Sequence, residues 1–173
     1  MTTEAPVAIN GVDLEAVAGL VGAVKDDPAA GATTWHAEVR WTGGFSSEAR
    51  VRSFAPVPSD EPPALGGGDT AANPVEQLLG ALGNCLAVGY AANASAAGIV
   101  LDDVRVDLEG DLDLHAFLGL GDGNAGFESI RVQVHLASAA APEALVELHE
   151  RVVSTSPVGH TLQRAVPVTV ELA

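Results

Sequence analysis

The sequence contains one cysteine, few basic side chains, few aromatic side chains and no long apolar run. Among its 173 residues, 8 are Lys or Arg and 23 are Asp or Glu, so the formal net charge is −15. Nucleic-acid-binding proteins present basic patches to phosphates, and this charge therefore argues against a nucleic-acid partner. No uninterrupted apolar stretch reaches the roughly 18 residues of a membrane span, and residues 1–6 lack the pattern of a secretory signal. We expect a soluble, cytoplasmic protein with no membrane partner.

The lone cysteine, Cys85, excludes a disulfide within the chain. Free cysteine is often a small buried residue, whereas a thiol whose thiolate form is stabilised by its surroundings is a nucleophile. Inert packing and covalent chemistry are therefore the two alternatives for Cys85, and covalent chemistry would need an external thiol partner. The five histidines share no spacing with acidic residues that is typical of a metal site. We expect no metal and no cofactor.

Hydrophobic periodicity predicts an α+β fold with a mostly antiparallel sheet. Apolar residues at helical spacing predict a helix over 13–24, capped by Asp13, and another from Pro142 to Val153. Alternating residues predict strands over 33–41, 49–53, 104–114, 130–136 and 167–172, with turns at 43–44 and 119–124. We expect Trp35 and Trp41 to pack the first strand against the helices.

Residues 55–72 form a long segment without periodicity. They include four prolines and the run Gly66-Gly67-Gly68. Such a segment is uncommon inside a compact domain, where it is usually functional or disordered. A pocket-lining loop and a mobile connector are both open interpretations.

A long helix is predicted from Pro74 to Ala97. Asn73 is a preferred N-cap, Glu76 favours the positive end of the helix dipole, and Gly98 suits the C-terminal cap. Apolar residues lie nearly all round this helix, so we expect burial on nearly all sides. Its small residues would let another backbone approach closely, and a symmetry-related copy of the helix is a candidate.

The stretch from Asn73 to Cys85, Asn-Pro-Val-Glu-Gln-Leu-Leu-Gly-Ala-Leu-Gly-Asn-Cys, resembles the OsmC/Ohr family of thiol-dependent peroxidases. The similarity continues through residues 97–99, 109–113, 126–128 and 156–158. The resemblance implies an OsmC-like fold, with antiparallel sheets wrapped around the long central helices of an intertwined homodimer. It also implies an N-terminal helical extension over residues 1–30 and an OsmC-like domain over residues 31–173.

The family's chemistry places a peroxidatic cysteine in the long helix, and Cys85 matches it. Ser156 stands where the resemblance expects a resolving cysteine, and Phe45 stands where it expects an arginine. The expected glutamate position is occupied by Val75, with Glu76 one residue later. These departures leave a one-cysteine mechanism, in which Cys85 reduces an organic hydroperoxide and an external thiol regenerates it. This mechanism would serve defence against oxidative stress.

Four residues are candidates to support Cys85. Arg50 could supply a cation from the predicted hairpin, although a solvated strand face also explains it. Glu76 could face the pocket or serve only the helix N-terminus. Ser156 and His160 follow the predicted helix from Pro142 to Val153; His160 could act as a base or a hydrogen-bond donor, and Ser156 occupies the position of the resolving cysteine. The alternative function is a non-catalytic OsmC-fold dimer that binds an apolar small molecule, with Cys85 structural.

Overall fold

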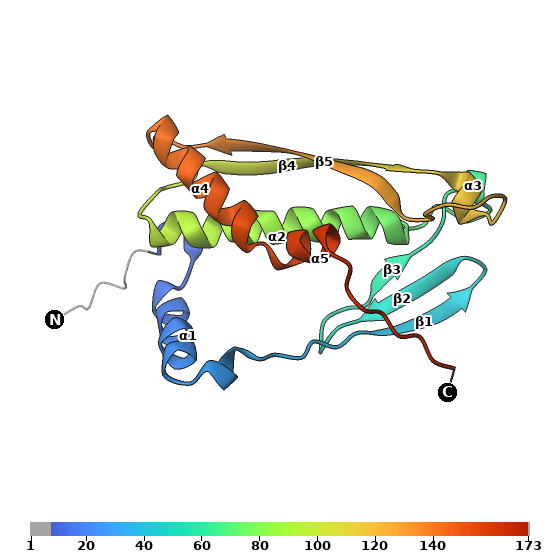
Figure 1. Cartoon of the computed structure of the whole chain (residues 1–173), viewed down its shortest axis with the longest axis horizontal. Coiled ribbons are helices and arrows are strands. Elements are labelled where there is room, and N and C mark those ends of the chain that lie inside the picture. The colour runs from blue at the N-terminus through green and yellow to red at the C-terminus, as the bar shows by residue number, and fades with distance from the viewer. Residues whose placement is uncertain (1–7, 173) are drawn as a thin grey trace. The chain divides into compact units, whose positions relative to one another are not determined.

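A computed structural model describes residues 8–172 of the chain (Figure 1). The expectation for residues 1–6 lies outside the described residues. The chain divides into two compact units, one combining the residues up to Leu14 with those from Leu79 onward, the other spanning Glu15–Leu78. No helix in the described part of the chain is long and apolar enough to cross a membrane. The predicted α+β class with antiparallel sheets is confirmed.

The unit from Glu15 to Leu78 contains a helix and a three-stranded antiparallel sheet. Its elements are α1 (Leu14–Asp26), the 3-10 turn η2 (Pro28–Gly31), β1 (Glu38–Gly43), β2 (Ser46–Arg50), β3 (Val57–Ser59) and η3 (Pro63–Leu65). The predicted helix and the turn at Gly43-Gly44 are confirmed. The first strand begins at Glu38 instead of Thr33 because its partner strand ends at Arg50, the residue opposite Glu38.

The two tryptophans, which we expected to pack the first strand against the helices, are exposed within the single chain. Trp35 is 81% exposed and Trp41 is 74% exposed. Nε1 of Trp35 donates to Oγ1 of Thr33, and Nε1 of Trp41 donates to the Gly44 carbonyl. Each indole is therefore held by its own local segment.

Residues 55–72 are more ordered than their composition predicts, since they contain β3, η3 and a buried carboxylate. Asp60 is 2% exposed and accepts hydrogen bonds from the Thr70 hydroxyl and from the backbone N–H groups of Glu61, Gly68 and Thr70. The Thr70 hydroxyl, followed by the backbone donors, holds the pKa of Asp60 below its usual value although burial opposes this. A Cβ at Gly67 would lie 1.8 Å from the Glu61 carbonyl oxygen, so only glycine fits there.

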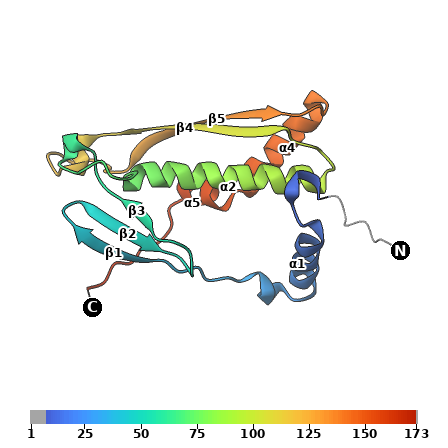
Figure 2. The ribbon, with the colours of Figure 1, turned by 180° about the vertical axis from the view of Figure 1, so that it is seen from behind.

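The other unit is built around the long helix. The long helix α2 spans Pro74–Ala96, and its part from Leu79 onward belongs to this unit. The other elements are η1 (a 3-10 turn, Ile9–Gly11), β4 (Asp103–Leu112), α3 (Leu114–Phe117), β5 (Phe127–Ala137), α4 (Pro142–Thr155) and α5 (Pro157–Gln163). β4 and β5 form an antiparallel ribbon that runs alongside α2 in both views (Figures 1 and 2). The buried core joins α2 to α4 through Leu82, Leu86, Tyr90, Ala94, Leu148 and Val152.

Three expectations for this unit are wrong. Leu114 begins a short helix instead of extending a strand, because Asp113 caps it by accepting from the His115 N–H. Residues 167–172 form no strand, since no other strand of the described chain pairs with them, and Val168 is 81% exposed. The long helix buries one face only, and Val88 on another face is 69% exposed.

Candidate functional site

The start of α2 is positioned by a reciprocal cap. Oδ1 of Asn73 accepts from the Glu76 N–H at 2.9 Å, and Oε2 of Glu76 accepts from the Asn73 N–H at 2.8 Å. Two unpaired backbone donors are satisfied together in this way, which is the capping-box arrangement. The interpretation of Glu76 as a residue of the helix N-terminus is therefore confirmed, and its carboxylate is engaged there.

Cys85 lies about three turns into α2, and its side chain is neither buried nor fully exposed. Its Sγ lies 3.3 Å from Oγ of Ser156, a residue 71 positions further along the chain. Ser156 is 5% exposed and caps α5, its Oγ accepting the Gly159 N–H at 3.1 Å. Because that bond uses the oxygen as an acceptor, the hydroxyl hydrogen is available to the sulfur.

The two side chains line a pocket of about 380 Å³ between α2 and the end of α4. Its walls are formed by Asn84, Cys85, Val88, Gly89, Ala92, Asn93, Val152, Thr155, Ser156 and Pro157. Gly89 permits the close approach of the two helices, since a Cβ there would lie 2.9 Å from Cγ1 of Val152. The pocket is walled by apolar groups, hydroxyls and amides, and none of these lining residues is charged.

The remaining sequence-predicted residues have other partners. Arg50, on β2, is paired with Glu48 at 2.5 Å. Nε2 of His160 donates to the Ser154 carbonyl at 3.0 Å, and its Nδ1 faces the Arg164 guanidinium at 3.4 Å. A guanidinium can only donate, so Nδ1 accepts from Arg164 and the neutral imidazole carries its proton on Nε2. Among the predicted site residues from Leu79 onward, Cys85 and Ser156 are in contact, whereas His160 has other partners.

Several pocket residues were missed from the sequence. Val88, Gly89, Ala92 and Asn93 follow Cys85 at spacings of three, four, seven and eight, the periodicity of one helix face. That signal was present in the predicted helix and could have identified this wall. The contribution of Thr155, from α4, has no such local signal because it depends on how the two helices pack.

A family model described as OsmC-like protein matches residues 66–171. An OsmC-like protein from Mycoplasma pneumoniae is structurally similar, with a TM-score of 0.66 and 19% identity over 76% of this chain and 88% of that chain. An organic hydroperoxide resistance protein OsmC from Legionella pneumophila has a TM-score of 0.55 and 20% identity, over 76% of this chain and 90% of that chain.

An organic hydroperoxide resistance protein from Elizabethkingia anophelis, with thiocyanate bound, has a TM-score of 0.56 and 19% identity, over 76% of this chain and 90% of that chain. These identities establish a shared fold. No curated protein matches the sequence significantly. The family model covers more than half of the chain, including the capping box, Cys85 and Ser156, and the chain therefore belongs to the OsmC-like protein family.

Proposed function

We propose that this protein reduces organic hydroperoxides by a one-cysteine mechanism and serves in defence against peroxides. The observation that carries this proposal is the accessible thiol of Cys85 in a pocket, with the Ser156 hydroxyl 3.3 Å from its sulfur. Membership of the OsmC-like family supports it, as does the likeness to proteins named for organic hydroperoxide resistance.

In the proposed first step, the Cys85 thiolate attacks one oxygen of the hydroperoxide. An S–O bond forms, the O–O bond breaks, and the departing alkoxide takes a proton and leaves as an alcohol. Cys85 is oxidised by two electrons to the sulfenic acid, and the hydroperoxide is reduced by two electrons. The Ser156 hydroxyl donates to Sγ, which stabilises the thiolate because a hydrogen bond to the charged form favours that form.

The second step requires a thiol from outside the chain, since a serine hydroxyl at position 156 forms no disulfide. The external thiol attacks the sulfenic sulfur, so that a mixed disulfide forms and water leaves. A second external thiol then attacks the mixed disulfide, which releases the Cys85 thiol and an external disulfide. We propose a low-molecular-weight thiol or a thiol protein as this reductant.

Non-catalytic binding of an apolar small molecule is the second candidate function. It is favoured by the absence of a charged side chain among the described residues that line the Cys85 pocket. Reactive cysteines usually lie beside a cation that stabilises the thiolate. Under this alternative, Cys85 and Ser156 form part of the wall that touches the ligand.

The two functions are separated by the reaction of the reduced protein with cumene hydroperoxide. We expect sulfenic acid at Cys85, trapped with dimedone and located by mass spectrometry, to form much faster than on free cysteine. Ser156→Ala should slow this step about tenfold, as expected for the loss of a hydrogen bond to a charged group. Cys85→Ser should abolish it. A wild-type rate equal to that of free cysteine, and unchanged by Ser156→Ala, would establish the binding function instead.

We also propose a cytoplasmic homodimer, with residues 1–30 as an extension of an OsmC-like domain over residues 31–173. The large apolar side chains that one chain leaves exposed, such as Trp35, Trp41 and Val88, support a second copy as their cover. Sedimentation equilibrium should give twice the chain mass, and a monomer at micromolar concentration would contradict the dimer.

A further inference from the structure

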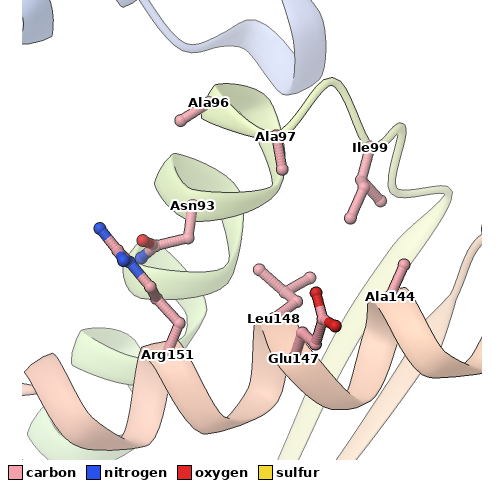
Figure 3. A pocket seen from close by; sticks show the side chains of 8 residues that line it. All are labelled: Asn93, Ala96, Ala97, Ile99, Ala144, Glu147, Leu148 and Arg151. Atoms are coloured by element: carbon pink, nitrogen blue, oxygen red, sulfur yellow. The ribbon is translucent and has the colours of Figure 1, made fainter.

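A second pocket, of about 510 Å³, lies between the end of α2 and the first turns of α4 (Figure 3). Its lining residues are Asn93, Ala96, Ala97, Ile99, Ala144, Glu147, Leu148 and Arg151. Pockets of roughly 300–1,000 Å³ are typical small-molecule sites. The pocket shares Asn93 with the Cys85 pocket but is otherwise formed by different residues, and the proposed peroxide chemistry does not use it.

The pocket carries one charge of each sign. Glu147 and Arg151 are four residues apart on α4, so their backbones are about 6 Å apart along the helix axis. A glutamate followed by an arginine at this spacing commonly forms an ion pair. No such pair joins them among the ion pairs of residues 8–172. In the view of Figure 3, the Arg151 side chain extends toward Asn93, and the Glu147 side chain extends on the other side of Leu148.

The surface between the two charges is apolar, with one polar acceptor. Leu148, which is 5% exposed, and the methyl groups of Ala96 and Ala97 supply the apolar part. Nδ2 of Asn93 donates to the Gly89 carbonyl at 2.8 Å, so its Oδ1 is the atom available to accept a hydrogen bond in the pocket.

We propose that this pocket binds a short zwitterion whose ammonium and carboxylate are separated by several bonds, such as a dipeptide or an ω-amino carboxylate. The ammonium binds Glu147, the carboxylate binds Arg151, and the apolar body contacts Leu148 and the two alanines. The amide N–H of a dipeptide donates to Oδ1 of Asn93. A free α-amino acid carries both charges on one carbon, and we expect it to bind more weakly because Glu147 and Arg151 are too far apart to form an ion pair with each other.

The test uses 5-aminopentanoate as the zwitterion, with pentanoate and pentylamine as probes that each lack one charge. Binding to the ¹⁵N-labelled full chain is followed by NMR at the Asn93 side-chain amide. We expect 5-aminopentanoate to bind about fivefold more tightly than either single-charge probe, the effect of an exposed ion pair at the upper end of its range. Alanylalanine should bind with the same preference.

Variants of the two charges give opposite signatures. Arg151→Gln should weaken the binding of 5-aminopentanoate and of pentanoate, and it should leave the binding of pentylamine unchanged. Glu147→Gln should weaken the binding of 5-aminopentanoate and of pentylamine, and it should leave the binding of pentanoate unchanged. Both side chains are exposed, so circular dichroism should show an unchanged fold. The charge-exchanged variant E147R/R151E should restore the preference for the zwitterion, because both charges are again present.

Three results would overturn the proposal. The first is equal affinity for all three probes. The second is an unchanged NMR chemical shift of the Asn93 side-chain amide at 5-aminopentanoate concentrations up to about 10 mM, far above the Kd of a useful ligand. The third is a change at Asn93 that follows protein concentration without added zwitterion, which would assign the pocket to a contact between copies of the chain. None of these readouts depends on hydroperoxide reduction by Cys85.

Discussion

At the residue scale, the proposed chemistry depends on one thiol and one hydroxyl. Ser156 has two roles at once, since its Oγ accepts the Gly159 N–H in the first turn of α5 and lies 3.3 Å from the Cys85 sulfur. The cap fixes the position of the serine. Within the described chain, Ser156 is the only side chain that forms a hydrogen bond with the thiol. A residue with an ordinary role as an N-cap thus becomes part of the candidate site.

This contact predicts that Ser156→Cys creates a disulfide with Cys85. A sulfur–sulfur bond of about 2.0 Å requires only a small shift from the present separation. We expect one equivalent of cumene hydroperoxide to remove both free thiols, as counted with a chromogenic disulfide reagent. Ser154→Cys is the matched control, since the Ser154 hydroxyl bonds the Arg151 carbonyl instead. Retention of both thiols in Ser156→Cys would contradict the contact.

Tyr90 is the second residue with a defined chemical environment. It is fully buried at 0% exposure, and its hydroxyl lies 2.5 Å from Nδ1 of His149. Burial raises the pKa of the Tyr90 phenol, because the charged form is disfavoured away from water. As Tyr90 is the only tyrosine of the chain, its ionisation can be followed without interference from another phenol.

The raised pKa of Tyr90 predicts a loss of stability at alkaline pH. The folded state favours the neutral phenol, so its contribution is complete below pH about 10, the unfolded value, and falls as the pH rises toward the folded value. Absorbance at 295 nm should give a midpoint above that of free tyrosine. Tyr90→Phe should remove this alkaline dependence, and the lost hydrogen bond should cost about 1 kcal/mol at neutral pH. A midpoint equal to that of free tyrosine would refute the prediction.

At the element scale, α2 positions the site through its small residues. Gly89 lies against Val152 of α4, and the pocket beside Cys85 lies next to this contact. The same helix also carries Gly80, where an added methyl group would meet no other atom within 4 Å. The small residues of α2 are therefore not equivalent, although the sequence presents them as one pattern.

Gly89→Ala and Gly80→Ala form a matched pair that tests this difference. The added methyl at position 89 would lie 2.9 Å from Cγ1 of the rigid Val152 side chain, and we expect a loss of about 1–3 kcal/mol. At position 80 nothing lies within 4 Å, so the higher helix propensity of alanine should add about 0.5–1 kcal/mol. Urea unfolding measures both, and equal effects would contradict the close helix approach.

At the scale of the whole molecule, the N-terminal segment is joined to the end of α2. Nδ2 of Asn10 donates to the Ser95 hydroxyl at 3.1 Å and to the Ile99 carbonyl at 2.9 Å, and its Oδ1 accepts the Leu101 N–H at 2.9 Å. Asn10 also has a φ of 54°, a left-handed conformation that asparagine tolerates better than most residues. One side chain thus connects segments about ninety positions apart.

Asn10→Ala should therefore destabilise the protein by about 1–3 kcal/mol, because the Leu101 N–H and the Ile99 carbonyl lose their partner. Asn124→Ala is the control, since the Asn124 amide caps only a local exposed turn at Gly126. A surface change of that kind should stay within about 0.5 kcal/mol. Equal unfolding midpoints for the two variants in urea would show that Asn10 does not anchor the segment.

Much of the fold was predictable because its signals are local. The reciprocal cap of Asn73 and Glu76, the turn at Gly43-Gly44 and the alternation of β5 each depend on residues only a few positions apart. The prediction of a strand over residues 167–172 failed because alternation is only a local signal. A strand also needs a partner strand, and none in the described chain pairs with this segment. The buried Asp60 loop was missed because its donors come from residues up to ten positions away.

The sequence by itself determined the position of Cys85 within a capped helix, the α+β class and the resemblance to the OsmC/Ohr family. The tertiary structure alone decided that Ser156 is the partner of the thiol and that Arg151 and Glu147 face a separate pocket. The physical reason is the separation along the sequence of the residues that interact. Helix caps and periodicity arise between near neighbours in the chain, whereas a site is made by packing that joins residues up to 71 positions apart.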